Sequence, residues 1–371
     1  MNPAAWRLDA AAGTAIAAIG ALLLMPTPHT VAPPVPAGPL TLAQAWPAAR
    51  THDLVAALPD GSTLAPAAVL DAQTVIVQVT NAGTASLAVL ALTDPTHPRV
   101  LQQMAVGAGA TFDGVTVSGS AAYWMTSVPG GAGGSHATLY RADVAAGAVD
   151  KISDDTGQAT FSASQYDLQV VDGRVYWNAT RSTSPLANEI RSVAVDGGPV
   201  TVRPLADDSR LTAWPWLVST PGTDQPVTEL NLVTGVRHTI TPTPGERFSC
   251  GPVWCRGLVP GPHTNVITDR RVDGSGTPIR INNNGEDAPF VDAAALDRFE
   301  TLAAKITNPA AGLARRLPSA AEHLALYDLK TRRHVALAIS TGVGTAGSWL
   351  WWSTNANETL TWHLLNLTTL H

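Results

Sequence analysis

The side chains most able to do chemistry in this sequence are acidic residues in four short polar stretches, SDDTGQ, LADDSR, TPGER and NNGED. They are Asp154, Asp155, Asp207, Asp208, Glu246, Glu286 and Asp287. Gathered on one surface, their carboxylates could bind Ca²⁺ through oxygen ligands or attract a basic segment of a partner. Asp, Asn and Gly also favour turns whatever the function, so ordinary turn chemistry is the competing interpretation. Arg210 and Arg247 would neutralise part of such a cluster.

Two of these carboxylates could instead act as general acid and general base. A glycoside-cleaving pair must lie about 5 to 10 Å apart across a pocket, which spacing along the chain cannot establish. The sequence has no G-x-S-x-G, H-E-x-x-H, Walker or dinucleotide-binding motif, and its histidines are scattered singly. It therefore assigns no catalytic residue and no cofactor, with Ca²⁺ as the one ion that the acidic stretches could hold.

Cys250 and Cys255 are the only cysteines, in the stretch SCGPVWC. An even count at short spacing in an exported protein predicts a disulfide, here between two neighbouring strands. A structural zinc site needs four ligands, and no second cysteine pair or His-x-His motif lies nearby. We therefore expect a disulfide bond that fixes the local geometry of these strands rather than a metal site.

Composition limits the class of protein. Of the 371 residues 45% are hydrophobic and only 14% charged, with a net charge of −6. The sequence lacks the basic stripe that neutralises phosphates, so nucleic acid is not expected as a partner. Low charge with many turn-forming and β-branched residues favours a β-rich protein outside the cytoplasm.

The N-terminal segment predicts export. Residues 10–25 form an uncharged apolar run that could be a signal peptide or could just span a bilayer, and we favour an uncleaved membrane anchor over residues 1–25. A proline-rich linker is expected over residues 26–50, and the folded domain over 51–371. The expected location is the cell membrane with the domain outside the cytoplasm, and secretion is the alternative.

A pattern of short strands repeats seven times in the folded domain. The copies span residues 74–104, 121–152, 171–200, 214–240, 252–281, 298–339 and 348–371, each preceded by another short apolar stretch. Equivalent positions hold Ile76, Trp124, Trp177, Trp216, Trp254, Phe299 and Trp351. Four strands per unit of about 40 to 50 residues indicate an all-β, seven-bladed β-propeller with antiparallel blades, six or eight blades being less favoured.

The seventh copy ends after its second strand, so the ring needs a strand from elsewhere. Residues 52–58, HDLVAAL, precede the first unit without a place in it. An open blade would leave an unpaired strand edge, and we expect this N-terminal strand to close the last blade.

The strand endings LYRADVAAG, SVAVDGG, LNLVTG, RRVDGSG and ALYDLKT carry a family resemblance. They resemble the secreted bacterial propellers of the TolB/YVTN type, over about residues 52–371. The resemblance implies a propeller that binds or scaffolds and names no activity. We therefore expect a non-catalytic binding propeller, with an envelope protein or glycan as its partner. The alternative is a hydrolase or lyase that acts on an extracellular polymer through the acidic residues.

Overall fold

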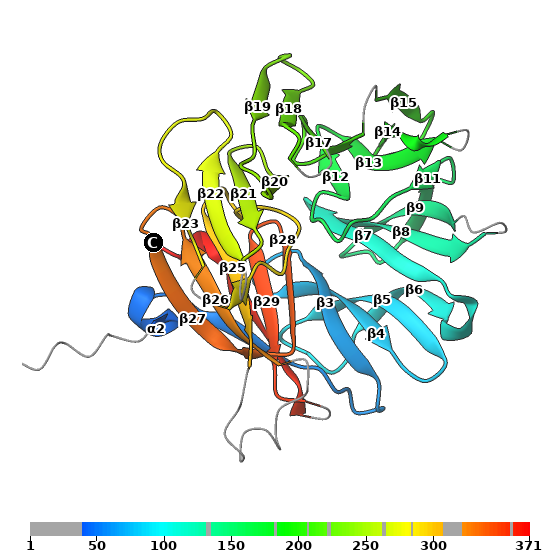
Figure 1. Ribbon diagram of the computed structural model, residues 1–371. Helices are drawn as coiled ribbons and strands as arrows, with labels where there is room; N and C mark the ends of the chain where they lie inside the picture. Colours follow the sequence, from blue (N-terminus) through cyan, green and yellow to red (C-terminus); the bar gives the residue numbers. More distant parts are fainter. Residues whose placement is uncertain are drawn as a thin grey trace, which may run out of the picture. The chain divides into compact units, whose positions relative to one another are not determined.

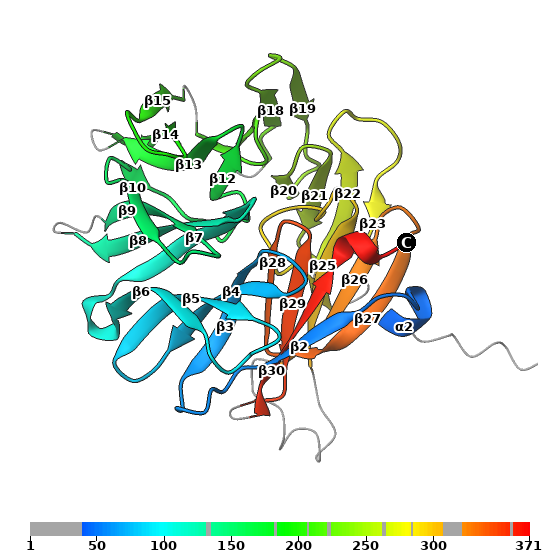
Figure 2. The ribbon, with the colours of Figure 1, turned by 180° about the vertical axis from the view of Figure 1, so that it is seen from behind.

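The structure is a computed structural model that describes residues 39–371 except 131–134, 182–183, 206–207, 221–223, 262–264, 283–284, 307–320 and 357–358. Residues Pro39–His371 form one compact unit. Its strands pair into seven separate sheets that follow one another around a ring (Figure 1). The predicted seven-bladed β-propeller is confirmed. Figure 2 shows the same ring from behind.

The first three blades follow the chain from the inside of the ring outward. Blade one is β3 (Thr63–Val69), β4 (Thr74–Thr80), β5 (Thr84–Ala91) and β6 (Arg99–Ala105), followed by the 3-10 turn η1 (Val106–Ala108). Blade two is β7 (Thr111–Ser118), β8 (Ala121–Pro129), β9 (Ser135–Asp143) and β10 (Val149–Ser153). Blade three begins with a strand in two pieces, β11 (Gln158–Ala159) and β12 (Leu168–Val171), and continues with β13 (Arg174–Arg181), β14 (Ser184–Ala194) and β15 (Thr201–Pro204). The first strands of blades seven, one, two and three touch in turn, through the pairs β28 and β3, β3 and β7, and β7 and β12, which places them around the centre.

The remaining blades repeat this plan. Blade four is β16 (Ser209–Leu211), β17 (Trp216–Ser219), β18 (Val227–Asn231) and β19 (Arg237–Ile240). Blade five is β20 (Arg247–Cys250), β21 (Trp254–Val259), β22 (Val266–Arg271) and β23 (Ile279–Arg280). Blade six has β24 (Glu286–Asp287), β25 (Phe299–Lys305), β26 (Glu322–Asp328) and β27 (Arg333–Ser340). Blade seven has β28 (Gly342–Ala346), β29 (Trp349–Thr354) and β30 (Thr361–Asn366), with the 3-10 turn η4 (Leu367–Thr369) at its end.

Local sequence explains these strands and their turns. The strand β4 reads TVIVQVT, a run of β-branched residues suited to a half-buried pleated surface. Between β12 and β13, Asp172 and Gly173 both have positive φ, 49° and 72°. A two-residue hairpin turn of this kind needs positive φ at both positions, which Asp and Gly tolerate.

The chain termini close the ring together. The strand β2 (Thr51–Val55) pairs antiparallel with β30, so the N-terminal strand supplies the missing outer strand of blade seven, as predicted. The strand β1 (Leu40–Thr41) pairs in parallel with β27 and adds a fifth strand to blade six. The short helix α2 (Leu42–Ala45) follows it. Residues 40–45, inside the expected linker, are therefore attached to the propeller.

Periodic large side chains fill the wedges between blades. Ile76, Trp124, Trp177, Phe299 and Trp351 are all buried. Each wedge holds its own hydrophobic cluster; for example, Trp352 of blade seven packs with Phe299 of blade six. These repeated aromatics therefore serve packing between blades.

The predicted disulfide between Cys250 and Cys255 is present. The two residues are directly paired between β20 and β21, so the bond joins the first and second strands of blade five. Among the described residues, no helix is long and apolar enough to cross a membrane. The expected anchor over residues 1–25 lies outside the described residues.

A segment of blade three reaches across the ring. Residues 160–167, between β11 and β12, form a loop outside the strands, and in this loop Ser164 donates a hydrogen bond to Asp292 at 2.6 Å. The backbone N–H of Gln165 donates to Asp292 at 2.8 Å, and its side-chain oxygen accepts from the N–H of Gly347 at 3.1 Å. Blade three is thus tied to blades six and seven, which are not its neighbours in the ring.

Candidate active site

The predicted acidic residues lie between the last strand of one blade and the first strand of the next. Asp154 and Asp155 lie between β10 and β11, and Asp208 directly precedes β16. Glu246 directly precedes β20, while Glu286 and Asp287 form β24. Asp207 lies outside the described residues.

Each described member of this set has a local partner. The pairs are Asp154 with Lys151 at 2.8 Å, Asp155 with Arg191 at 2.5 Å, Asp208 with Asn188 at 2.7 Å, Glu246 with Arg270 at 2.6 Å, Glu286 with His334 at 2.7 Å, and Asp287 with Asn265 at 2.6 Å. Every partner comes from the same blade or an adjacent one. Within the described part of the chain, no group of three or more His, Cys, Asp or Glu residues could hold a metal ion.

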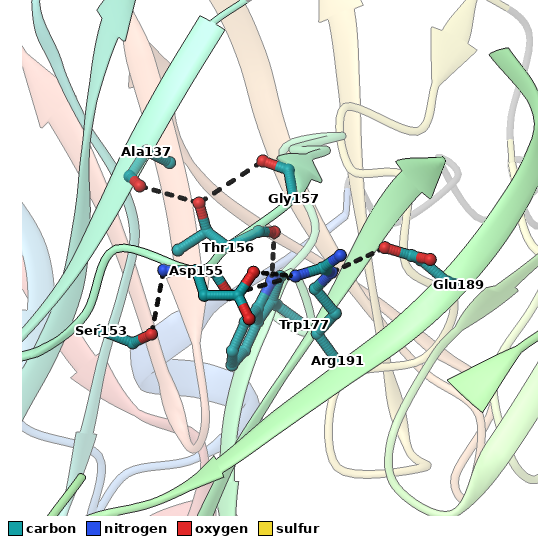
Figure 3. Close-up of polar contacts among 8 residues, drawn as sticks. All are labelled: Ala137, Ser153, Asp155, Thr156, Gly157, Trp177, Glu189 and Arg191. Carbon is teal, nitrogen blue, oxygen red and sulfur yellow. Dashed lines mark hydrogen bonds and ion pairs between the residues drawn. The ribbon is translucent and has the colours of Figure 1, made fainter. Parts of the chain in front are cut away.

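Asp155 illustrates how these carboxylates are used (Figure 3). Arg191, on β14, donates to Asp155 at the edge of blade three and to the buried Glu189 at 2.6 Å. Beside it, Trp177 donates its indole N–H to the carbonyl of Thr156 at 2.9 Å. The connection between blades two and three is therefore held by a hydrogen-bonded and ionic network.

A different set of side chains has the arrangement of a nucleophilic centre. In blade seven the strands lie in the order β2, β30, β29, and Asp53, His363 and Trp352 are directly paired across them. Thr354 follows Trp352 by two residues, so it lies on the same face of the sheet. Trp352 packs into the cluster shared with blade six, so this face is turned toward that blade.

Two consecutive hydrogen bonds join the three polar side chains of this set through the two ring nitrogens of His363. Thr354 Oγ1 lies 2.8 Å from His363 Nε2, and His363 Nδ1 lies 2.7 Å from Asp53 Oδ1. A carboxylate only accepts, so Nδ1 carries the proton and Nε2 is free to accept the hydroxyl hydrogen. The imidazole is also stacked on Trp352, with centroids 5.5 Å apart. Hydroxyl, base and orienting carboxylate are therefore aligned as in a Ser-His-Asp triad, with threonine in the place of serine.

Solvent can reach this set. The side chain of His363 is 20% exposed and that of Asp53 is 64% exposed. We call Asp53, His363 and Thr354 the blade-seven triad.

A second Thr, His and Asp set in the chain lacks this order. On blade one, Asp94 Oδ1 and Thr96 Oγ1 both lie near the same ring nitrogen, Nδ1 of His97, at 2.8 and 3.1 Å. Hydroxyl and carboxylate therefore contact the same nitrogen of His97 instead of opposite sides of the ring. This set provides a natural comparison for the blade-seven triad.

Sequence reasoning missed the blade-seven triad. It treated His363 as one of the scattered single histidines, and Asp53 lies 310 positions away in the chain. The only available signal was the expectation that residues 52–58 pair with the last strand. That pairing brings an acidic residue beside a histidine once the register is known.

Buried acidic residues form a further feature that sequence did not reveal. Glu229 on β18 is fully buried and neither carboxyl oxygen bonds to any described residue; burial alone raises its pKa to about 8. Between blades five and six, Asp269 is equally buried, and burial, with the nearby Glu300, raises its pKa well above the ordinary range. Glu300 itself is paired with Arg256 at 2.7 Å. Burial thus favours the protonated, uncharged form of Glu229.

Known proteins resemble the chain in structure and not in sequence. No protein-family model matches it, and no curated protein does. One of two analysed prolyl endopeptidases matches with a TM-score of 0.51 at 13% identity, over 79% of this chain and 46% of that one. The acylaminoacyl peptidase of Pyrococcus horikoshii matches with 0.47 at 8%, over 82% and 51%. The oligogalacturonate lyase of Vibrio parahaemolyticus matches with 0.43 at 7%, over 86% and 97%.

These likenesses correct one expectation. The chain spans about half the length of the two peptidases, and at such identities the likeness shows the fold alone. The expectation of a non-catalytic binding propeller is nevertheless contradicted, because a solved structure that matches with a TM-score above 0.5 is a prolyl endopeptidase, which is an enzyme. The findings favour the hydrolase or lyase alternative.

Proposed function

We propose that the protein is a hydrolase that cleaves acyl bonds, esters first of all, with Thr354 as nucleophile. The observation that carries this proposal is the line from Thr354 Oγ1 through His363 to Asp53, with both contacts within 2.8 Å and on different ring nitrogens. Nucleophile, base and orienting group within hydrogen-bond reach are the geometric requirement for covalent acyl transfer.

The reaction proceeds in two halves. Thr354 Oγ1 bonds to the carbonyl carbon of the ester while its proton passes to His363 Nε2. The tetrahedral adduct collapses, the carbon–oxygen bond to the alcohol breaks, and the alcohol leaves with the proton from His363. Water, deprotonated by the same nitrogen, then attacks the acyl-threonine, releases the carboxylic acid and restores the hydroxyl.

Asp53 and Trp352 have positioning roles in this scheme. Asp53 accepts from Nδ1–H, which fixes the tautomer and stabilises the imidazolium that forms when the proton arrives. Trp352 holds the imidazole plane by stacking. Both groups limit the ring to the orientation in which Nε2 faces Thr354.

The reaction class and the location are proposed on separate grounds. The peptidases that resemble the chain are named for hydrolysis of peptide bonds, which is also acyl transfer to water. We propose that the propeller is of the secreted TolB/YVTN type and acts outside the cytoplasm, tethered through residues 1–25. Its substrate is then an acylated polymer of the cell envelope, a glycan or a protein.

The test combines turnover with covalent labelling. Full-length protein is assayed with 4-nitrophenyl acetate, then treated with a fluorophosphonate, and the modified residue is located by peptide mass spectrometry. The wild type should be labelled at Thr354, and Thr354→Ala or His363→Gln should lower turnover by about 10²- to 10⁴-fold. Thr354→Ser should retain or raise turnover, because a primary hydroxyl is less hindered.

Controls separate this site from unspecific ester cleavage. Asp53→Asn keeps the side-chain shape but removes the negative charge that fixes the Nδ1–H tautomer and stabilises the imidazolium, and should lower kcat with little change in KM. His97→Gln should leave turnover unchanged, because His97 lacks the aligned contacts. Label on another residue, full turnover in Thr354→Ala, or an inert wild type would each overturn the proposal.

A further inference from the structure

A pocket between blades four and five is distinct from the blade-seven triad. Its volume is about 330 Å³. Its walls come from the end of β17, the start of β18 and the start of β20. These strand ends belong to the face that carries the connections between blades, where Glu246 and Arg247 lie. The pocket is therefore reached from the face on which the sequence placed its acidic residues.

Positive charge dominates this pocket. Arg210 and Arg247 both line it, and neither forms an ion pair with a residue that the structure describes. Burial raises the pKa of Asp292, and hydrogen bonds from Ser164 and Gln165 together with the charge of Arg210 partly oppose this shift. Two guanidinium groups on one small cavity favour an anionic ligand, since their planar forks match an oxyanion.

The single acidic wall residue does not cancel this charge. Glu246 is 2% exposed, and its Oε1 accepts from Arg270 at 2.6 Å. Its Oε2 accepts from the backbone N–H and the hydroxyl of Thr243, both at 2.9 Å. The carboxylate is therefore already neutralised by a third arginine and turned into the protein.

The remaining walls suit a ring with hydroxyl groups. Val218, Val227 and Phe248 supply an apolar side, while Ser219, Thr220 and Gln225 supply donors and acceptors around it. Such a combination of one apolar side and a few convergent polar groups is typical of small-molecule sites. Glu229 is directly paired with the wall residue Val218, and burial favours the uncharged form of its carboxyl, which does not repel an anion.

We propose that this pocket binds a saccharide unit carrying an oxyanion, the carboxylate of a uronic acid or a sulfate ester, within a polysaccharide chain. The arginines bind the oxyanion, the polar side chains bind ring hydroxyls, and the apolar side covers the ring. The inference does not depend on the blade-seven triad, because binding is measured without turnover in the Thr354→Ala background.

Calorimetry with three matched oligosaccharides tests the assignment. A uronate trimer, a sulfated trimer and a neutral trimer of comparable size are titrated into full-length Thr354→Ala protein. One of the two charged trimers should bind at least about 10-fold more tightly than the neutral one, and more weakly as salt screens the contact. The uronate and sulfate arms identify which oxyanion is preferred.

Variants locate the binding to this pocket. Arg210→Gln and Arg247→Gln should each weaken binding by about 10-fold or more, as for loss of a hydrogen bond to a charged group. Arg237→Gln, on the exposed outer strand of blade four, removes the same charge and should change nothing. Equal binding of the neutral trimer, unchanged affinity in both pocket variants, or binding of free sulfate but of no trimer would overturn the proposal.

Discussion

Replacing Glu229 by glutamine should prevent much of the loss of stability that the protein undergoes between pH 5 and pH 8. Glu229 is fully buried on β18, and neither of its carboxyl oxygens bonds to a described residue. Burial disfavours the charged form, and this alone raises the pKa of the group from 4.5 to about 8. The folded protein therefore keeps a proton that the unfolded chain gives up at lower pH.

The sign and size of the change in the free energy of unfolding follow from this difference in proton binding. Between pH 4.5 and 8 the unfolded state binds fewer protons at this position, so the free energy of unfolding falls as pH rises. The free energy of unfolding falls by about 1.4 kcal/mol per pH unit, and the summed loss relative to pH 4.5 approaches about 5 kcal/mol at pH 8. Glutamine has the shape of the protonated acid and no charge to suppress. We expect equal stability of the two proteins at pH 4.5 and a growing advantage of Glu229→Gln above it.

Urea unfolding of both proteins at pH 5, 6, 7 and 8 measures this difference directly. Subtracting the two curves removes contributions from other buried acids, such as Asp269, which act in the same direction. Glu189→Gln is the matched control: Glu189 is also buried but ion-paired with Arg191 at 2.6 Å, and its loss should destabilise the protein at every pH. Parallel stability curves for wild type and Glu229→Gln would show that Glu229 finds a partner or water, and the reasoning would fail.

Two further predictions concern the closure of the ring and the wedge between blades five and six. Leu54→Asp changes a side chain that is 1% exposed on β2, so it should break the pairing of β2 with β30 and cause self-association through the freed edge of β30. Val55→Asp changes a residue that is 56% exposed on the same strand, and this variant should remain monomeric in light scattering. Arg256→Met should lower the free energy of unfolding by about 3 to 5 kcal/mol, because it leaves the buried Glu300 without its cation, and adding Glu300→Leu should recover part of the loss in urea titrations.

The architecture was accessible from sequence because each blade repeats the same local pattern. Equivalent aromatic positions, turn residues and the short seventh copy were enough to predict seven blades and closure by residues near His52. The disulfide followed from the spacing of two cysteines. The attachment of residues 40–41 to β27 was not predicted, since a two-residue parallel strand has no periodicity to detect.

The candidate site was less accessible, for a physical reason. The acidic residues that sequence selected lie in the expected connections, but their described members are engaged with partners such as Lys151 and Arg270, which only the structure reveals. The blade-seven triad depends on the register of three strands from opposite ends of the chain. Glu229 belongs to no motif that would mark it in the sequence, and its isolation becomes visible only in the burial and contacts of β18.

The pairing of β2 with β30 also sets the order in which the blades can be completed during synthesis. The strand β2 leaves the ribosome before any blade is formed, while β30, its partner, follows blades one to six in the chain. Contacts this distant along the chain form slowly because a long loop must close first. Until then the chain exposes the unpaired edge of β2 together with the apolar side chain of Leu54. The blade that carries Thr354, His363 and Asp53 is thus completed after blades one to six, so the proposed activity would require synthesis through β30.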